Sequence, residues 1–251
     1  DKSEGLSGHT IYLTIDEGIQ YMAEHALESA VERTQARGGT VIVMDPRTGG
    51  ILAWTLRPTF DPNHVQELTP DRWRNRALTD PYEPGSTMKM ILAAAALEEG
   101  QVQPDSLIYA GDGEMPLSGT VIHDHEKAGW LTFREVLQQS SNVAAVKIAI
   151  GLGEDHMYRY LREFGFGEKT GIDLPGESIG LLSKRKKWGS RTLSSVAMGQ
   201  EIGVTPLQMV TAAAAIANEG ILMKPFIVER VRAERGGDVW QREPEIRRRP
   251  I

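Results

Sequence analysis

A lysine amine follows a serine hydroxyl by one helical turn in the stretch Tyr82-Glu83-Pro84-Gly85-Ser86-Thr87-Met88-Lys89-Met90-Ile91-Leu92. The Pro-Gly pair interrupts regular structure just before the serine, and residues 88–99 are rich in Ala, Leu, Met and Glu. A helix is therefore predicted to begin at about Ser86. Residues three apart on a helix are about 5–6 Å apart at Cβ, so Ser86 and Lys89 are predicted to share one helix face.

This pair has the chemistry of a nucleophile with its own base. A lysine with a lowered pKa can take the hydroxyl proton as Ser86 attacks a carbonyl, and the N–H groups at a helix N-terminus can stabilise the oxyanion that forms. Taken alone, Ser-x-x-Lys is more often a helix cap followed by a solvated charge. Lys89, however, lies in a run that is apolar almost all round, which predicts a buried helix. A lysine there must be paired or neutral, and both states suit a functional amine.

Composition predicts a globular chain with a sizeable core. The 251 residues suffice for one large domain or two small ones, and 40% of them are hydrophobic. Acidic residues exceed basic ones by 34 to 28, a formal charge of −6, so no global field favours nucleic acid, and no nucleic-acid partner is expected. The basic runs 184–187 and 247–249 are interpreted as solvated loop or tail residues.

The residue types also narrow the possible sites. There is no cysteine, which excludes disulfides, thiolate metal sites and cysteine nucleophiles. The cluster His123-Asp124-His125 has two ring ligands without a third and is interpreted as a polar loop rather than a zinc site. No metal and no cofactor are therefore expected. No run of about 18 apolar residues and no signal peptide is visible, and Asp1–Gly5 is interpreted as a start inside a longer parent protein.

Periodicity predicts a mixed N-terminal half. Residues 9–15 alternate as a short strand, and Asp16 is placed to cap an amphipathic helix that extends to Gly38-Gly39. Residues 40–55 contain two β-rich runs around a turn with Pro and Gly, which predicts a hairpin. Residues 57–80 contain several Pro, Asn and Asp residues and are predicted to be irregular.

Helices dominate the predicted second half. Residues 101–130 are polar and glycine-rich, which indicates loops with short strands. The expected helices begin at a capping box of Thr132 and Glu135, cover residues 143–152 and about 154–164, and begin again at Thr205-Pro206-Leu207-Gln208, ending at Gly220. One or two strands are predicted within 226–242, followed by a charged tail.

The sequence Ser140-Ser141-Asn142 stands at a junction between two predicted helices. Its hydroxyl and amide groups could hydrogen-bond Lys89, Ser86 or a substrate amide. Ser and Asn are also the usual residues at helix caps, so helix capping is the alternative interpretation.

Together, Ser86-x-x-Lys89 and Ser140-x-Asn142 resemble two of the three signatures of the penicillin-recognising serine acyltransferases. The resemblance covers about residues 10–230 and is to class B penicillin-binding proteins. It rests on Asp45-Pro46-x-Thr48-Gly49 within residues 39–54, Asn75-Arg76-Ala77, residues 83–89, Phe164-Gly165-Phe166-Gly167, residues 171–177 and Gly199-Gln200-x-x-x-Val204-Thr205-Pro206-Leu207-Gln208.

The resemblance implies an α/β (α+β) fold, with an antiparallel sheet begun by residues 40–55, flanking helices and an all-helical subdomain. It also implies a D,D-transpeptidase that cross-links peptidoglycan stem peptides in the bacterial periplasm or on the outer face of the cell membrane. Ser86 would be the acylated nucleophile, with its backbone N–H in the oxyanion hole, and Lys89 its general base. Ser140 would relay a proton, and Asn142 would bind the substrate amide and Lys89.

Binding partners follow from the same resemblance. β-Lactams would acylate Ser86 because they mimic the D-Ala-D-Ala terminus of the stem peptide. A membrane-embedded glycan polymerase and other cell-wall machinery are the expected protein partners, reached through N-terminal segments of the parent protein.

The third family signature, Lys-Thr/Ser-Gly on a strand, has no match at its usual place. Lys169-Thr170-Gly171 spells it, but inside the loop between two other family motifs, and we interpret it as a coincidence. Residues 1–251 are therefore interpreted as a transpeptidase domain without its N-terminal anchor or pedestal and without its C-terminal Lys-Thr/Ser-Gly strands. A second chain or a further segment would supply those strands, because their absence leaves an apolar sheet edge beside residues 40–55.

Two alternatives stay open at this point. The same fold could serve β-lactam hydrolysis or β-lactam sensing, although such relatives usually differ at the position of Asn142 and lack the Gly171–Glu177 loop sequence. The second alternative is a non-catalytic assembly module, or a fragment, that keeps the fold without the third signature. The deacylation rate separates the first from a transpeptidase, and failure of the folded chain to acylate would favour the second.

Overall fold

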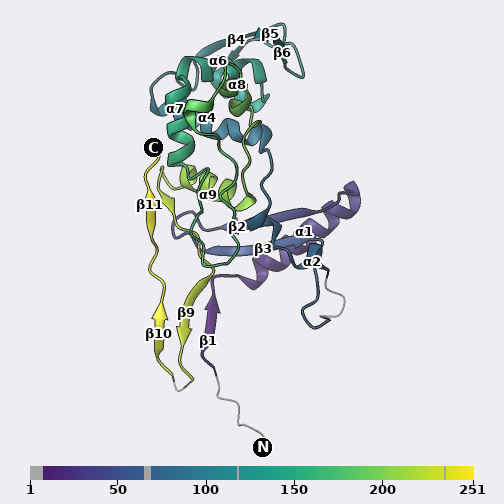
Figure 1. The fold of residues 1–251 in the computed structure, drawn as a ribbon, viewed down its shortest axis with the longest axis vertical. Helices are drawn as coiled ribbons and strands as arrows, with labels where there is room; N and C mark the ends of the chain where they lie inside the picture. The colour runs from purple at the N-terminus through teal and green to yellow at the C-terminus, as the bar shows by residue number, and fades with distance from the viewer. Residues whose placement is uncertain (1–7, 65–68, 118, 235) are drawn as a thin grey trace, which may run out of the picture.

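The computed structural model describes residues 8–64, 69–117, 119–234 and 236–251. Figure 1 shows an elongated molecule with a helical region at one end, α1 and a hairpin across the middle, and a narrow three-stranded arm at the other end. Two predictions concern residues outside the described ones: Asp1–Gly5, interpreted as a start inside a longer protein, and residues 65–68 of the segment predicted to be irregular.

The N-terminal elements follow the sequence pattern closely. β1 (Thr10–Leu13) leads to α1 (Glu17–Thr34), where the carboxylate of Asp16 accepts a hydrogen bond of 2.9 Å from the N–H of Ile19, as a cap should. The helix ends before the predicted Gly pair, because Gln35 adopts a left-handed conformation with φ 53°.

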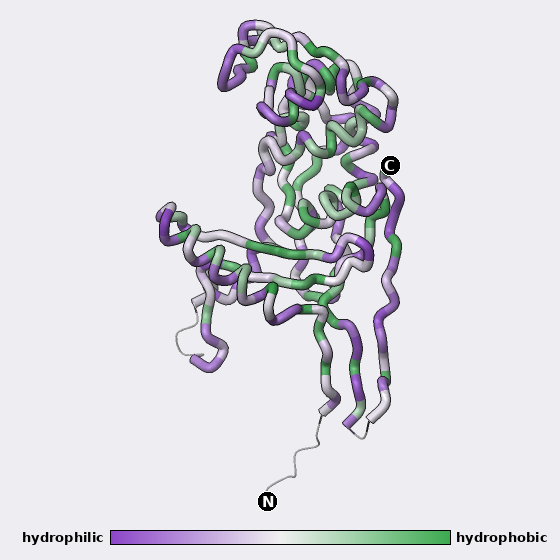
Figure 2. The backbone as a smooth tube through the Cα atoms, turned by 180° about the vertical axis from the view of Figure 1, so that it is seen from behind, coloured by the Kyte–Doolittle hydropathy of each residue, from purple (hydrophilic) through white to green (hydrophobic). Residues whose placement is uncertain are grey.

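The predicted hairpin is present as β2 (Gly39–Met44) and β3 (Ile51–Arg57), which pair antiparallel. Helix α1 packs on β3, and α9 (Pro206–Ala217) packs on β2. Figure 2 shows the apolar residues running along these strands between the helices. The loop segment around Phe226 lies against the start of β3, where the N–H of Ile51 donates to the Phe226 carbonyl at 3.0 Å.

The mixed α/β class is confirmed, with several small sheets in place of one large sheet. The described residues form antiparallel sheets of order β1-β9-β10, β11-β8, β2-β3, β4-β7 and β5-β6. The short strands expected within 101–130 are β4 (Leu107–Gly111), β5 (Glu114–Leu117), β6 (Thr120–His123) and β7 (Gly129–Thr132).

The segment at 57–80 is more regular than predicted. It contains two short helices, α2 (Pro70–Trp73) and α3 (Arg76–Thr79). Leu78 of α3 is buried in the cluster that includes Leu207 and Ala214 of α9. Burial against a distant helix therefore stabilises a segment whose local sequence favours turns.

The helical region is built around α4 (Lys89–Glu98), α6 (Asn142–Leu152) and α7 (Glu154–Glu163), which pack against one another. Two shorter helices, α5 (Phe133–Gln138) and α8 (Thr192–Ala197), complete it. Both predicted capping boxes are present, at Thr132 with Glu135 and at Thr205 with Gln208. One face of α4 is less buried than predicted, since Met90 and Leu97 are each 40% exposed.

The C-terminal strands are β8 (Leu222–Met223), β9 (Val228–Arg232), β10 (Asp238–Gln241) and β11 (Ile246–Arg248). Two of them, β9 and β10, confirm the strands predicted within 226–242. Within the described residues, no helix is both long and apolar enough to cross a membrane.

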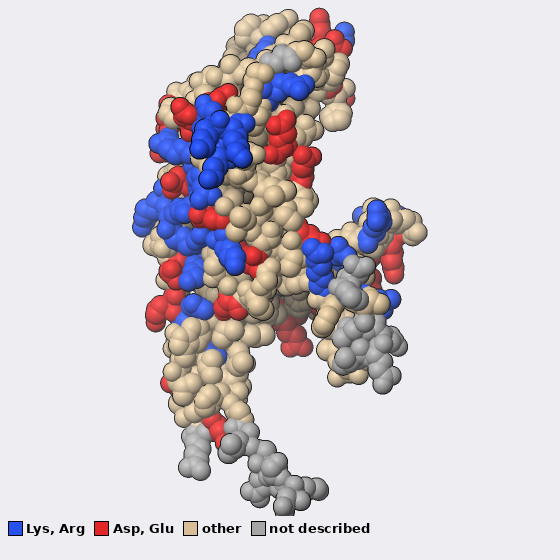
Figure 3. All heavy atoms as spheres, in the orientation of Figure 1, with Lys and Arg blue, Asp and Glu red and all other residues tan. Residues whose placement is uncertain are grey.

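The interpretation of the basic runs is partly wrong. Lys184, Lys186 and Lys187, around the short 3-10 helix η3 (Arg185–Lys187), are exposed as predicted, but Arg185 pairs with Glu154 and Asp155 at the start of α7. Figure 3 shows basic side chains gathered over the flank where α7 and β11 lie, with acidic ones among them.

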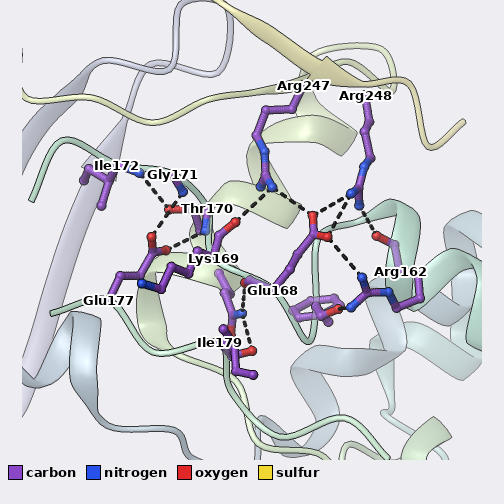
Figure 4. Close-up of polar contacts among 12 residues, drawn as sticks. Arg162, Glu168, Lys169, Thr170, Gly171, Ile172, Glu177, Ile179, Arg247 and Arg248 are labelled. Atoms are coloured by element: carbon purple, nitrogen blue, oxygen red, sulfur yellow. Dashed lines mark hydrogen bonds and ion pairs between the residues drawn. The ribbon is translucent and has the colours of Figure 1, made fainter. Parts of the chain in front are cut away.

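The C-terminal end is not a solvated tail. Arg247 and Arg248 of β11 both contact the carboxylate of Glu168, at 2.8 and 2.7 Å, and Arg162 of α7 reaches the same carboxylate at 3.1 Å (Figure 4). A carboxylate that lies beyond α7 therefore ties the C-terminal strand to the helical region, an ion-pair network that the two distant sequence segments do not reveal separately.

Candidate active site

The serine helix begins where the sequence predicts. Its first turn is a 3-10 helix, η2 (Gly85–Met88), which continues into α4. In a 3-10 turn the side chains at i and i+3 eclipse, and the N–H of Lys89 bonds back to the carbonyl of Ser86. Ser86 and Lys89 therefore leave the helix on the same side, as expected from their spacing.

The two side chains have opposite surroundings. Ser86 is exposed, and its hydroxyl makes no hydrogen bond with the described residues. Lys89 is only 3% exposed. The nucleophile candidate is thus open to a ligand, while the amine beside it is held inside the protein.

Three oxygens surround the amine of Lys89. Its Nζ donates to the carbonyl of Ser140 at 2.6 Å, to Oγ of Ser140 at 3.0 Å and to Oδ1 of Asn142 at 2.8 Å. These acceptors match the three N–H donors of an ammonium group. Loss of one proton leaves a lone pair that the Ser140 hydroxyl, which can donate as well as accept, is placed to satisfy.

Burial shifts the amine toward that neutral state. It lowers the pKa of Lys89 to about 8, and the negative charge of Asp124 opposes the shift. A substantial fraction of the amine is therefore neutral at mildly alkaline pH, as a general base requires.

An unusual backbone conformation brings Ser140 to the amine. Ser140 has φ 55°, a left-handed conformation that non-glycine residues rarely adopt. It follows α5 directly, after the C-cap residue Gln139. The turn directs both the carbonyl and the hydroxyl of Ser140 at Lys89, so the strain is associated with the site.

Asn142 is the first residue of α6, and its amide is oriented from both ends. Oδ1 accepts from Lys89, and Nδ2 donates to the carbonyl of His123 at 2.9 Å. One N–H of the amide makes no hydrogen bond within the described residues. It could donate to a ligand amide.

Both interpretations of the 140–142 segment hold. Ser141 is the N-cap of α6, with its Oγ accepting from the N–H of Ala144 at 3.0 Å. Ser140 and Asn142, on either side of it, contact Lys89. The structure thus brings Lys89, Ser140 and Asn142 into one cluster, one turn along the helix from Ser86.

Asp124 is a site residue that the sequence pattern does not reveal, since the interpretation of residues 123–125 is a polar loop. Its carboxylate accepts hydrogen bonds from the Ser141 hydroxyl at 2.6 Å and from the N–H of Val143 at 3.0 Å, and it also contacts the N–H of Asn142. These contacts join segments 17 to 19 residues apart. Only the path of the chain through β6 and β7 brings them together.

A cavity of about 360 Å³ opens beside Asn142, between β6 and α8. Its polar lining includes His123, Arg191, Ser195 and Gln200. The cavity therefore offers a polar ligand hydrogen-bonding groups and charges of both signs, from Arg191 and Glu201, next to the Lys89 cluster.

The Lys169-Thr170-Gly171 segment is a loop and not a strand. Thr170 is 2% exposed, and the N–H groups of Thr170 and Gly171 donate to the carboxylate of Glu177 at 2.6 and 3.1 Å (Figure 4). This conformation agrees with the interpretation that the sequence match to the third signature is a coincidence.

Comparisons with known proteins place the chain in a family. The model of the penicillin binding protein transpeptidase domain matches residues 39–251. Penicillin-binding protein PbpB of Mycolicibacterium smegmatis is 33% identical over 98% of this chain and 38% of that protein. Peptidoglycan D,D-transpeptidase FtsI of Escherichia coli is 31% identical over 91% of this chain and 38% of that protein.

A solved structure agrees over the whole chain. Penicillin binding protein 3 of Mycobacterium tuberculosis, in complex with aztreonam, superposes with a TM-score of 0.91 at 32% identity, covering 100% of this chain and 56% of that one. The chain spans less than two fifths of the length of the two curated relatives above. The family match, the sequence identity and the shared fold together show that this chain belongs to the penicillin-binding protein transpeptidase domain family.

Proposed function

We propose that this chain carries the acylating residues of a D,D-transpeptidase that cross-links peptidoglycan stem peptides, and that β-lactams acylate the same serine. The observation that carries the proposal is the buried amine of Lys89, whose pKa is lowered to about 8, one turn after an exposed serine. A buried lysine with no counter-ion in direct contact is costly to a fold unless the neutral amine has a use.

In the proposed reaction, neutral Lys89 takes the proton of Ser86 while Oγ of Ser86 bonds to the carbonyl carbon of the penultimate D-Ala. The Ser86 N–H at the start of the helix stabilises the oxyanion. The C–N bond then breaks, and the Ser140 hydroxyl passes the proton from Lys89 to the departing D-Ala amine. An amine of a second stem peptide later attacks the ester and releases Ser86.

Asn142 has two tasks in this scheme. Its Oδ1 holds Lys89 in place, and its remaining N–H donates to the carbonyl of a substrate amide. Ser86 and Lys89 make no direct hydrogen bond with each other among the described residues. Catalytic hydrogen bonds often tighten only when substrate binds.

The proposal extends to parts outside these residues. A cationic strand of the Lys-Thr/Ser-Gly type, from a further segment or a second chain, would bind the substrate carboxylate and supply the second oxyanion N–H. The parent protein would act on the outer face of the cell membrane, anchored by an N-terminal segment and working with a glycan polymerase and other cell-wall proteins. The relatives named as a penicillin-binding protein and a peptidoglycan D,D-transpeptidase support a site of action on peptidoglycan; the anchor and the protein partners rest on the sequence resemblance.

Intact-mass spectrometry after incubation with benzylpenicillin tests the proposal, with Ser86→Ala as the control. We expect one adduct with the mass of the intact antibiotic on the parent sequence and none on the variant. Circular dichroism establishes that both proteins are folded. A folded chain without an adduct would contradict the proposal and favour a non-catalytic assembly module or an incomplete site.

The lifetime of the adduct separates the remaining alternative. A transpeptidase has no residue dedicated to activating water against the ester, so the adduct should persist for many minutes after free antibiotic is removed. Loss of the adduct within seconds would indicate a β-lactam hydrolase. No observation in the structure favours that activity.

A further inference from the structure

We propose that Asp124 is a positioning residue for acylation: its carboxylate fixes the turn at residues 140–142 and so places the two side chains that hold the amine of Lys89. This inference deepens the proposed function and rests on it. Asp124 touches neither Ser86 nor Lys89 through a hydrogen bond, and it acts through the residues between them.

The first support is the complete satisfaction of the N-terminus of α6. The first four N–H groups of a helix have no partner inside it. Here that of the N-cap residue Ser141 bonds to the carbonyl of Val136, those of Asn142 and Val143 bond to Asp124, and that of Ala144 bonds to the Ser141 hydroxyl. Asp124 also accepts from the Ser141 hydroxyl at 2.6 Å, so it orients the other cap as well.

The second support is that the same loop holds Asn142 by its side chain. The carbonyl of His123 accepts from Nδ2 of Asn142, which leaves Oδ1 facing Lys89. His123, the last residue of β6, and Asp124 directly after it therefore fix Asn142, the first through the side-chain amide and the second through the main chain. A loop needed only for capping would have no reason to orient the amide.

The loop itself is anchored. The N–H of Asp124 donates to the carbonyl of Gly113 at 2.8 Å, at the base of the β5–β6 hairpin. A Cβ on Gly113, which has φ 79°, would approach the carbonyl oxygen of Glu126 at 3.1 Å. The hairpin and the loop after it thus form one close-packed unit that presents the carboxylate to α6.

The negative charge of Asp124 also affects the pKa of Lys89, an effect that helix capping alone would not produce. The carboxylate of Asp124 raises the pKa of Lys89 against the effect of burial, and it lies at the positive end of the α6 dipole. The other titratable groups near Asp124 are His125 and Glu126 on its own loop, and His123, which pairs with Glu114 of β5 at 3.6 Å. All four side chains are exposed, so solvent screens them more than it screens Asp124.

The test compares Asp124→Asn with two matched variants. Asp112→Asn makes the same chemical change at an exposed aspartate before the hairpin, whose side chain has no partner among the described residues. Ser141→Ala removes the other cap of α6 and leaves the carboxylate in place. The measurements are the second-order rate of acylation by a fluorescent penicillin from pH 6 to 10, thermal unfolding, and the pKa of Lys89.

That pKa is measured by NMR of ¹³Cε-labelled lysine in the Ser86→Ala background, where acylation plays no part. For Asp124→Asn we expect a lower Lys89 pKa, an acylation profile displaced to lower pH, and a maximal rate reduced about 10²-fold, the cost of misplacing reacting groups by about an ångström. Asp112→Asn should match the parent protein in all three. Ser141→Ala should lose stability but leave the lysine pKa nearly unchanged.

Three results would overturn the inference: an unchanged lysine pKa and rate in folded Asp124→Asn, the same rate loss in Asp112→Asn, or equal pKa changes in Asp124→Asn and Ser141→Ala. If Asp124→Asn does not fold, Asp124→Glu takes its place, because it keeps the charge and lengthens the side chain. The pKa of Lys89 in this variant should stay close to its value in the parent protein, while the acylation rate should still fall; a parental rate would refute positioning. A parent protein that never acylates would refute the proposed function, while the NMR titration would still report on Asp124.

Discussion

Gly85 and Gly199 meet backbone to backbone at the start of the serine helix. The N–H of Gly85 donates to the carbonyl of Gly199 at 3.1 Å, and a Cβ on Gly199 would lie only 2.1 Å from the carbonyl oxygen of Gly85. Close by, the N–H of Glu201 donates to the carboxylate of Glu83 at 2.9 Å. The segment after α8 therefore fixes where the helix begins, and with it the position of Ser86.

Gly199→Ala should damage both stability and acylation. The added methyl group collides with backbone atoms that cannot rotate away, and Gly199 has φ 75°. The expected loss is about 3 kcal/mol or more in the free energy of unfolding, measured by urea denaturation. Gly100→Ala is the matched control, since Gly100 has φ 64° with no atom near the added Cβ; its loss should be about 1–2 kcal/mol, with acylation unchanged. Equal losses in the two variants would contradict the collision.

Ser140→Gly and Ser140→Ala should separate the hydroxyl from the backbone at this position. Both remove the Oγ that contacts Lys89, so both should slow acylation by penicillin by about 10²–10⁴-fold, the usual range for proton transfer. Only glycine relieves the left-handed strain at φ 55°. The free energy of unfolding of Ser140→Gly should therefore be about 1 kcal/mol higher than that of Ser140→Ala. Parental acylation in the glycine variant would show that the hydroxyl is not needed.

The acylation rate should follow the ionisation of Lys89. Because the neutral amine is the base, the rate should rise about tenfold per pH unit below pH 8 and level off above it. Lys89→Arg should be inactive across this range, since arginine stays protonated. Lys147→Arg, at a lysine that bonds the Tyr109 carbonyl at 2.6 Å, should keep the parental profile. A flat profile in the parent protein would exclude Lys89 as the titrating base.

The same pKa predicts how stability depends on pH. Folding lowers the pKa of Lys89 from its ordinary 10.5 to about 8, so between these values the unfolded chain binds more protons than the folded one. Lys89 should therefore make the free energy of unfolding increase as the pH rises from about 8 to 10.5, and Lys89→Met should lack this increase. Urea denaturation of both proteins at pH 8 and pH 10 measures the difference. A constant difference between the two proteins would contradict the lowered pKa.

Glu168→Gln should loosen the C-terminal strand. Neutralising one carboxylate leaves Arg162, Arg247 and Arg248 without their shared counter-ion, and the Glu168 side chain is 21% exposed. We expect the free energy of unfolding, measured by urea denaturation, to fall by about 1–3 kcal/mol, which lies between the values for exposed and buried ion pairs. Asp105→Asn, at an exposed pair with Arg134 of 4.0 Å, should change stability by less than about 0.5 kcal/mol. A similarly small effect at Glu168 would show that the network is screened.

The sequence predicted best what is decided within a few residues. The cap at Asp16, the two capping boxes and the Ser86–Lys89 spacing all depend on groups three residues apart, so the local pattern contains the whole interaction. The contacts of Lys89 with Ser140 and Asn142 were among those expected for the 140–142 segment. The catalytic roles of these residues remain predictions.

What the sequence missed depends on where distant segments meet. Asp124 reaches α6 through the β6–β7 loop, and a lone aspartate between two histidines has no periodicity that reveals it. Arg248 and Glu168 are 80 residues apart, so a basic run at the end of the chain gave the wrong impression of a free tail. The helix at 76–79 is likewise stabilised by burial of Leu78 against α9 and not by propensity.

The contacts of β11 with Glu168 also bear on how the molecule is made. A ribosome releases residues 154–168 long before residues 246–248, so during synthesis the end of α7 and the loop after it wait with Arg162 and Glu168 paired only to each other. Contacts of such long sequence separation form late because their loop-closure entropy must be met first. The ion pairs that join β11 to the end of the helical region therefore belong to the later steps of folding, after residues 246–248 have been synthesised.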